Sequence, residues 1–132
     1  MPIEQTAASA APYVRSIVRI MVALLFLEHG LSRLFGWPSP LPTPPMLTMY
    51  WFAGTIELLG GILLVLGLFT RPAAFLMSGL MAAAYFMVHA PKGFYPALNM
   101  GEAAVIYCFV FFYFVFAGPG PWSVDALARK RP

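Results

Sequence analysis

Charge is what this sequence has least of. Only 10% of its 132 residues are charged and 61% are hydrophobic, whereas soluble domains carry about 25% charged residues. A chain this apolar cannot cover its surface with polar groups, so we predict an integral membrane protein with a single domain. The net charge of +3 does not indicate nucleic-acid binding, because the cations are scattered singly or gathered at the C-terminus and form no basic face.

Cysteine is nearly absent as well, with Cys108 as the single example. Electron transfer by dithiol–disulfide exchange needs a pair of cysteines, so this chain cannot perform it internally. The C-x-x-C-H sequence that attaches haem covalently is also missing. Cys108 lies in an apolar, aromatic run, and we interpret it as a small buried hydrophobic residue.

Four apolar segments are present, each about the length that crosses a bilayer as a helix. They predict an all-α fold: an integral membrane, antiparallel four-helix bundle with short loops. Five prolines between Gly36 and Met46 separate the first two segments, since proline at this density cannot continue a helix. The predicted helices cover residues 13–35, 49–69, 72–89 and 99–117 of a transmembrane domain (13–121), between a flexible N-terminal lead (1–12) and a basic cytoplasmic tail (122–132).

An even number of spans places both termini on the same side of the membrane. Basic residues are concentrated on that side, so the positive-inside rule predicts that both termini are cytoplasmic. The predicted inner cations are Arg15, Arg19, Arg71, Arg129, Lys130 and Arg131, and the outer ones are Arg33 and Lys92. We expect Arg15 and Arg19 to extend from the first helix to the lipid headgroups.

Glu57 stands well inside the second apolar segment. A carboxylate in hydrocarbon costs on the order of 3 kcal/mol, so the protein must supply partners for Glu57 or use it. Gly54 and Gly61 share its helix face, which lets another helix or a ligand approach closely. We therefore expect Glu57 to point into the bundle.

Other polar residues fall in the same, outer half of the predicted bundle. Counted from the outer helix ends, Glu57 lies roughly 12 Å deep, Glu28 and His29 roughly 9–10 Å, Glu102 roughly 5 Å and Arg33 roughly 3 Å. His89 lies near the outer surface. One interpretation is an ion-pair network in which Arg33 neutralises a carboxylate and fixes the register of the helices. The other is a functional site, because intramembrane ionisable groups mark ligand and proton pathways.

The residues at these positions resemble those of the DoxX family. The shared pattern is His29-Gly30-x-x-Arg33-Leu34, then Gly54-x-x-Glu57-Leu58-x-Gly60-Gly61 with Thr70-Arg71, then Glu102, and finally Gly118-Pro119-Gly120 followed by Ser123-x-Asp125. The resemblance implies a small four-helix protein of a bacterial or archaeal inner membrane, linked to quinone and redox chemistry. A related member is the membrane subunit of a thiosulfate:quinone oxidoreductase, but this chain has no separate domain for sulfur chemistry.

We therefore predict a DoxX-like membrane subunit that binds quinone through its outer polar residues. Glu57 and Glu102 are the candidate catalytic, proton-exchanging groups, and His29, Arg33, Glu28 and His89 are the candidate ligand-binding groups, with no metal site. Of these candidate residues, only His29, Arg33, Glu57 and Glu102 match polar positions of the family pattern. A b-type haem between His29 and His89 is a weaker alternative, because it needs two facing imidazoles and His29 lies about two turns deeper.

The expected partners are membrane lipid, a soluble redox protein and further copies of the chain, with no nucleic acid. Whether the protein is itself an oxidoreductase subunit stays open at this point. The competing hypothesis is a non-enzymatic scaffold or assembly partner of a redox or stress-response complex, in which the polar residues only hold the helices together. A small-solute transporter has little support, since no repeat or broken helix is apparent.

Overall fold

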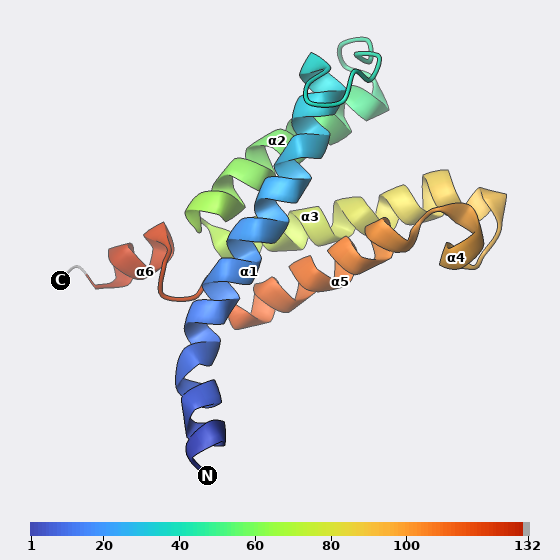
Figure 1. Cartoon of the computed structure of the whole chain (residues 1–132). Coiled ribbons are helices and arrows are strands. Elements are labelled where there is room, and N and C mark those ends of the chain that lie inside the picture. The colour runs from blue at the N-terminus through green and yellow to red at the C-terminus, as the bar shows by residue number, and fades with distance from the viewer. Residues whose placement is uncertain (131–132) are drawn as a thin grey trace.

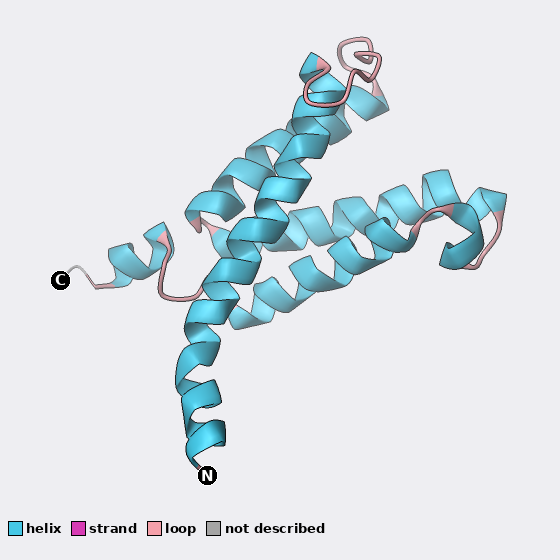
Figure 2. Ribbon diagram, in the orientation of Figure 1, coloured by secondary structure: helices cyan, strands magenta, loops and turns pink. Residues whose placement is uncertain are grey.

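The computed structural model describes residues 1–130, and this part of the chain is helical without a strand (Figure 2). Three stretches are long and apolar enough to cross a membrane, at 2–35, 49–66 and 70–92, and a fourth apolar helix of 16 residues is shorter. The elements in chain order are α1 (Pro2–Phe35), α2 (Met49–Leu66), α3 (Thr70–Ala84), a π-helical turn (Tyr85–His89), a 3-10 turn (Ala90–Lys92), α4 (Pro96–Asn99), α5 (Glu102–Ala117) and α6 (Val124–Arg129).

The helices are arranged as two hairpins. Helix α1 packs along α2, α3 packs along α5, and the hairpins meet chiefly through α2 and α3. Figure 1 shows the hairpins diverging from the region near α6 toward their two connectors. We call the region near α6 the closed end and the region of the connectors, residues 36–48 and 85–101, the open end. The predicted all-helical membrane fold is confirmed at this level, whereas the hairpins splay apart instead of running side by side throughout.

Glycines let the helices approach closely. A Cβ on Gly30 of α1 would lie 2.7 Å from the backbone nitrogen of Leu58 in α2, so these two backbones are in contact there. Gly60 of α2 similarly receives the side chain of Met77 from α3. Small residues at such contacts are how membrane helices gain packing energy without a hydrophobic driving force. The largest buried apolar side chains are Phe26, Leu64, Met77, Phe111 and Phe114.

Helix α1 is longer than predicted, because it begins at Pro2 and not at Tyr13. Proline suits the first helical turn, and the alanine-rich residues that follow have high helix propensity. The hydroxyl of Thr6 also donates to the carbonyl of Pro2 at 2.8 Å. The first ten residues are exposed and project beyond the other helices in Figure 1. Of the predicted tail, Arg131 and Pro132 lie outside the described residues.

The prediction that Arg19 reaches lipid headgroups is wrong. Arg19 is only 1% exposed, and its guanidinium donates to the carbonyls of Leu64 at 2.8 Å, Trp122 at 2.7 Å, and Pro119. Leu64 lies in the last turn of α2, where backbone carbonyls lack helical partners. A planar guanidinium can satisfy several such acceptors together, so Arg19 joins α1, the end of α2 and the segment before α6.

Asp125 of α6 accepts hydrogen bonds from backbone N–H groups at the start of α3. Its two carboxylate oxygens accept hydrogen bonds from the backbone N–H groups of Phe69 and Thr70, both at 2.9 Å. Burial alone would raise the pKa of Asp125, but these hydrogen bonds and the charge of Arg129 outweigh it and hold the pKa below its ordinary value. Arg71 completes this end by donating to the carbonyls of Val115 and Phe116 at the end of α5.

The remaining helix boundaries differ from the predicted ones at both ends of the molecule. The third helix starts at Thr70 and continues through the π-helical and 3-10 turns to Lys92. The fourth begins at Glu102, because Asn99 closes the short helix α4 and Met100 adopts a left-handed backbone conformation with φ of 60°. A residue in that conformation interrupts a right-handed helix.

Candidate functional site

A cavity of about 220 Å³ lies between the two hairpins at the open end. It gathers three of the six site residues predicted from the sequence, Glu57, His29 and His89. Its lining comes from α1, α2, the α3 extension and the start of α5: Phe26, His29, Glu57, Met81, Ala84, His89, Met100, Ala103, Ala104 and Tyr107. A mostly apolar cavity with a few convergent polar groups is typical of a ligand site.

Glu57 is the deepest charged group of this cavity, with 3% of its surface exposed. The Nε atom of Arg33 lies 3.2 Å from one carboxylate oxygen, and a terminal nitrogen lies 3.5 Å from the other. Gly54 makes room for this pair, because a Cβ there would come within 3.0 Å of the Arg33 side chain. The Arg33 guanidinium also lies 5.7 Å from the ring centre of Tyr50, within cation–π range.

The two histidines reach the cavity from different helices. The Nδ1 atom of His29 lies 3.0 Å from the carbonyl oxygen of Leu25, and Nδ1 of His89 lies 3.0 Å from the carbonyl oxygen of Asn99. A carbonyl oxygen can only accept a hydrogen bond, so each Nδ1 carries a proton. In a neutral ring this leaves Nε2 as an acceptor.

Asn99 holds the connector that carries His89. It is 1% exposed, its amide nitrogen donates to the carbonyl of Gly93 at 2.6 Å, and its amide oxygen accepts from the backbone of Gly101 at 2.8 Å. The hydroxyl of Tyr85 donates to the carbonyl of Phe94 in the same connector. Tyr85 and His89 bound the π-helical turn, and such turns recur at functional sites.

Tyr107 was not predicted as a site residue. Its ring packs edge-on against His29, with centroids 6.0 Å apart, and stacks on Phe111 at 5.9 Å. The sequence carried one usable signal, since Tyr107 follows Ala103 by four residues and Ala104 by three and therefore lies on the same side of the helix as both. In a helix this dense in aromatics, that face was not distinguishable without its neighbours.

A second cavity of about 280 Å³ lies between α1 and the proline-rich connector. Glu28 and Arg33 line it, and His29 lines both cavities. Glu28 is exposed and does not line the first cavity. Glu102, the first residue of α5, is exposed and lines neither of these two cavities. The structure therefore brings Glu57, His29, His89 and, through its ion pair, Arg33 together. Glu28 joins His29 and Arg33 only in the second cavity, and Glu102 lines neither of the two.

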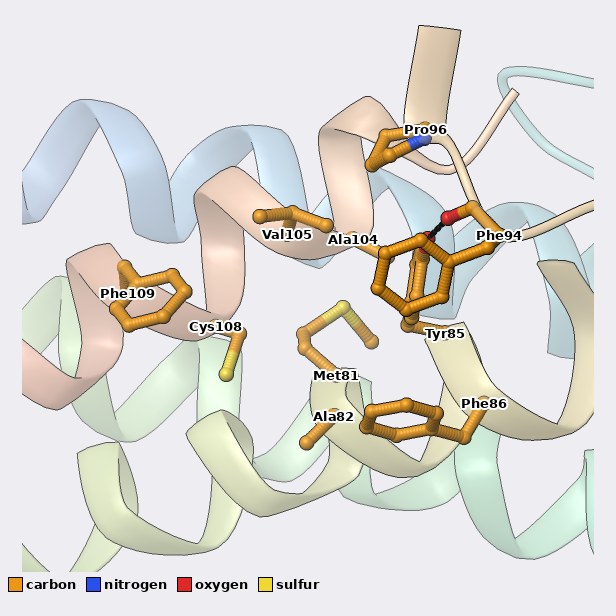
Figure 3. Close-up of a pocket in the computed structure, with 10 residues that line it drawn as sticks. All are labelled: Met81, Ala82, Tyr85, Phe86, Phe94, Pro96, Ala104, Val105, Cys108 and Phe109. Atoms are coloured by element: carbon orange, nitrogen blue, oxygen red, sulfur yellow. Dashed lines mark hydrogen bonds between the residues drawn. The ribbon is translucent and has the colours of Figure 1, made fainter. Parts of the chain in front are cut away.

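An apolar groove of about 480 Å³ runs between the α3 extension and α5 (Figure 3). Met81 and Ala104 line both this groove and the 220 Å³ cavity, so the two spaces adjoin. Figure 3 shows Met81 between Cys108 and Tyr85. The rings of Phe86 and Phe109, which border the groove, are both 65% exposed. In a membrane, this surface faces lipid chains.

The sequence of this chain matches that of a known protein family. The profile of the DoxX family matches residues 14–90, which include the His29–Arg33 and Gly54–Gly61 motifs. The chain belongs to the DoxX family. The matched region contains His29, Arg33, Glu57 and His89 and ends before Glu102 and the Gly118–Asp125 segment.

Several bacterial relatives share most of this DoxX chain. An uncharacterized protein of Haemophilus influenzae is 45% identical over 129 residues, which cover 91% of this chain and 94% of the relative. A second uncharacterized protein of that organism is 27% identical, covering 86% and 82%. An uncharacterized membrane protein of Mycobacterium tuberculosis is 26% identical, covering 86% and 80%. No solved structure matches the chain.

A b-type haem between His29 and His89 stays a prediction. Both histidines line the 220 Å³ cavity, and a b-type haem needs two facing imidazoles. Among residues 1–130, no group of three or more His, Cys, Asp or Glu side chains is placed to hold a metal ion.

Proposed function

We propose that this DoxX protein is a quinone-binding membrane subunit. The observation that carries the proposal is the cavity in which Glu57, His29, His89 and Tyr107 converge among apolar side chains. A quinone is a flat ring with two polar positions on opposite sides and a long apolar tail. Its ring requires a narrow apolar space with polar groups on more than one side, and His29 of α1 and His89 beyond α3 both line this cavity.

The adjoining groove supports a prenylated ligand in particular. A ring in the 220 Å³ cavity could pass its tail over Met81 and Ala104 into the 480 Å³ groove, which consists of apolar and aromatic side chains. Methionine suits such a junction because its unbranched thioether adapts to different shapes. The ligand would enter from the lipid phase, past the exposed rings of Phe86 and Phe109.

Proton exchange at the site belongs to the same proposal. The 280 Å³ cavity is lined by Glu28, His29 and Arg33, so His29 lies between the ligand cavity and the proline-rich connector. Glu57 holds Arg33 and lines the ligand cavity, which places an ionisable group beside the ring. Electrons would come from a soluble redox partner, and copies of this chain could associate through their exposed apolar faces. Glu102 has no part in this arrangement.

We further propose that both termini are cytoplasmic, in a bacterial inner membrane. Arg71, Arg129 and Lys130 are exposed at the closed end, whereas Lys92 and the half-buried Arg33 lie at the open end. This distribution agrees with the positive-inside rule even though Arg19 is withdrawn from the surface. The ligand cavity would then open toward the outer half of the membrane.

A structural scaffold is the second candidate function, and the Arg33–Glu57 ion pair favours it. Glu57 already has a partner, so its presence in α2 does not by itself require a ligand. In that case the polar groups would only set the register between α1 and α2. The exposed aromatic surface of α5 would then contact another membrane protein.

Purification from bacterial membranes distinguishes the two candidates. The protein in mild detergent should retain bound quinone, detected by chromatography of a solvent extract, and folded Glu57→Gln and His29→Ala variants should lose it. Glu102→Gln, outside the cavity, is the matched control and should retain quinone. Equal quinone in all four proteins, or none in the wild type, would favour the scaffold.

A further inference from the structure

In both histidines of the 220 Å³ cavity, the position of Nδ1 determines whether the ring can donate or accept a hydrogen bond to a ligand. Each Nδ1 faces a backbone carbonyl oxygen, that of Leu25 for His29 and that of Asn99 for His89. These acceptors belong to the backbone and cannot become donors, so neither ring can move its proton to Nε2 without losing a hydrogen bond. In its neutral form, each ring therefore has a hydrogen-bond acceptor, and not a donor, at Nε2.

The backbone holds this pattern firmly at His89. Asn99, whose carbonyl accepts from His89, is itself buried and bonded to Gly93 and Gly101. A Cβ on Gly101 would lie 2.9 Å from the Cβ of His89, so the backbone packs tightly against the base of that side chain. At His29 the acceptor is the carbonyl one helical turn earlier, which is fixed by α1 itself.

Two carboxylates share a cavity with His29. Glu57 lines the 220 Å³ cavity together with His29 and His89 and is paired with Arg33 at 3.2 Å. Glu28 lines the 280 Å³ cavity together with His29. The His89 ring also stacks against Tyr85.

The two redox forms of the ligand differ in what they need. A quinone presents two carbonyl oxygens, which only accept hydrogen bonds. A quinol presents two hydroxyl groups, which donate. A site that is built to receive a hydroxyl proton rejects an analogue without one, because the polar group of the site is then left unpaired.

We propose that this site is selective for the quinol over the quinone, with Nε2 of His29 and Nε2 of His89 accepting the hydrogen bonds of its two hydroxyl groups. This inference rests on the proposed quinone-binding function and adds the redox form. It makes His29 and His89 the residues that determine selectivity.

Binding of decylubiquinol and decylubiquinone to the full-length protein in lipid nanodiscs tests the proposal. The wild type should bind the quinol at least tenfold more tightly than the quinone. The reduction potential of the protein-bound quinone/quinol couple should then rise by about 30 mV, which corresponds to a tenfold affinity ratio for a two-electron couple. The variant His29→Gln/His89→Gln, whose amides can donate as well as accept, should bring the ratio close to one, mainly by weakening the quinol. Glu102→Gln, which lines neither the 220 Å³ nor the 280 Å³ cavity, is the control and should keep the wild-type ratio.

The outcomes separate the two proposals. Equal affinities in the wild type, or tighter binding of the quinone, would overturn the selectivity while leaving quinone binding intact. Binding of neither form would overturn the proposed function and the selectivity with it. Nitrogen-15 NMR of histidine-labelled protein gives an independent readout without variants: both rings should show a protonated Nδ1 and an unprotonated Nε2, and the opposite tautomer would contradict the proposal.

Discussion

Arg19 at the closed end and His29 at the open end both come from α1, yet the protein uses their polar atoms differently. The guanidinium of Arg19 is buried and surrounded by carbonyls from α2 and the segment before α6. The ring of His29 donates once to its own helix and otherwise faces two cavities. In a bilayer, a buried polar group without partners is costly, so the first arrangement is what stability alone would produce. The second suggests a binding role.

The largest effect is expected at Arg19. The substitution Arg19→Met should leave the carbonyls of Leu64, Pro119 and Trp122 without their donor and destabilise the protein by about 3 kcal/mol. Unfolding midpoints in detergent, titrated with sodium dodecyl sulfate, measure the loss. Arg19→Lys should recover only part of it, since an ammonium cannot reproduce the planar fork. Full stability in the Met variant would mean that the closed end does not depend on this residue.

The ion pair of the open end should matter less. Arg33→Gln leaves the buried carboxylate of Glu57 unpaired and should cost about 2 kcal/mol. The double variant Arg33→Gln/Glu57→Gln removes both charges and should regain most of that loss, as the same unfolding titration would report. If the double variant were as unstable as the single one, charge pairing would not be the reason for the loss.

The connector around His89 allows a finer comparison between two glycines. In Gly101→Ala the new Cβ would meet the Asn99 amide oxygen at 2.8 Å and the Cβ of His89 at 2.9 Å, so we expect a loss of about 1–2 kcal/mol. In Gly79→Ala the new Cβ meets nothing within 4 Å, so this matched control should be neutral or slightly stabilising. Equal effects of the two would argue against tight packing of the connector.

The smallest effect concerns Asp125 and depends on pH. Its folded pKa is depressed, so its contribution is present above the unfolded value of about 3.9 and is lost as the pH falls through the lower folded value. Asp125→Asn keeps one acceptor for the start of α3 and should cost about 1 kcal/mol near neutral pH. The difference between the two proteins should shrink below about pH 4; a difference that is constant with pH would contradict the carboxylate cap.

Sequence reasoning reached the helical membrane fold because long apolar runs and proline-rich breaks are local signals. It also selected Glu57, His29 and Arg33, since charged residues inside an apolar run stand out. Arg19 was misinterpreted because its position near the start of a span is also where an arginine that extends to the headgroups would stand. Only the return of residues 118–122 to α1, a contact between distant segments, turns it inward. Tyr107 was not predicted for the same reason, because its contact with His29 depends on which helix packs beside α1.

The length of α1 shows a different limit. Pro12 and the polar residues before it suggested a lead outside the helix, whereas alanine-rich propensity continues α1 back to Pro2. Glu28 and Glu102 show a third limit. Depth along a helix placed both with the cluster, but neither lines the 220 Å³ cavity, and Glu28 instead lines the 280 Å³ cavity with His29 and Arg33.

The contrast between the two ends is tested most directly by measuring decylubiquinol binding and the unfolding midpoint on the same preparation of His29→Gln. If the open end is a ligand site, quinol affinity should fall at least tenfold while the midpoint stays within experimental error of the wild type. Unchanged quinol affinity together with a lowered midpoint would show that His29 serves the fold, and would contradict the account.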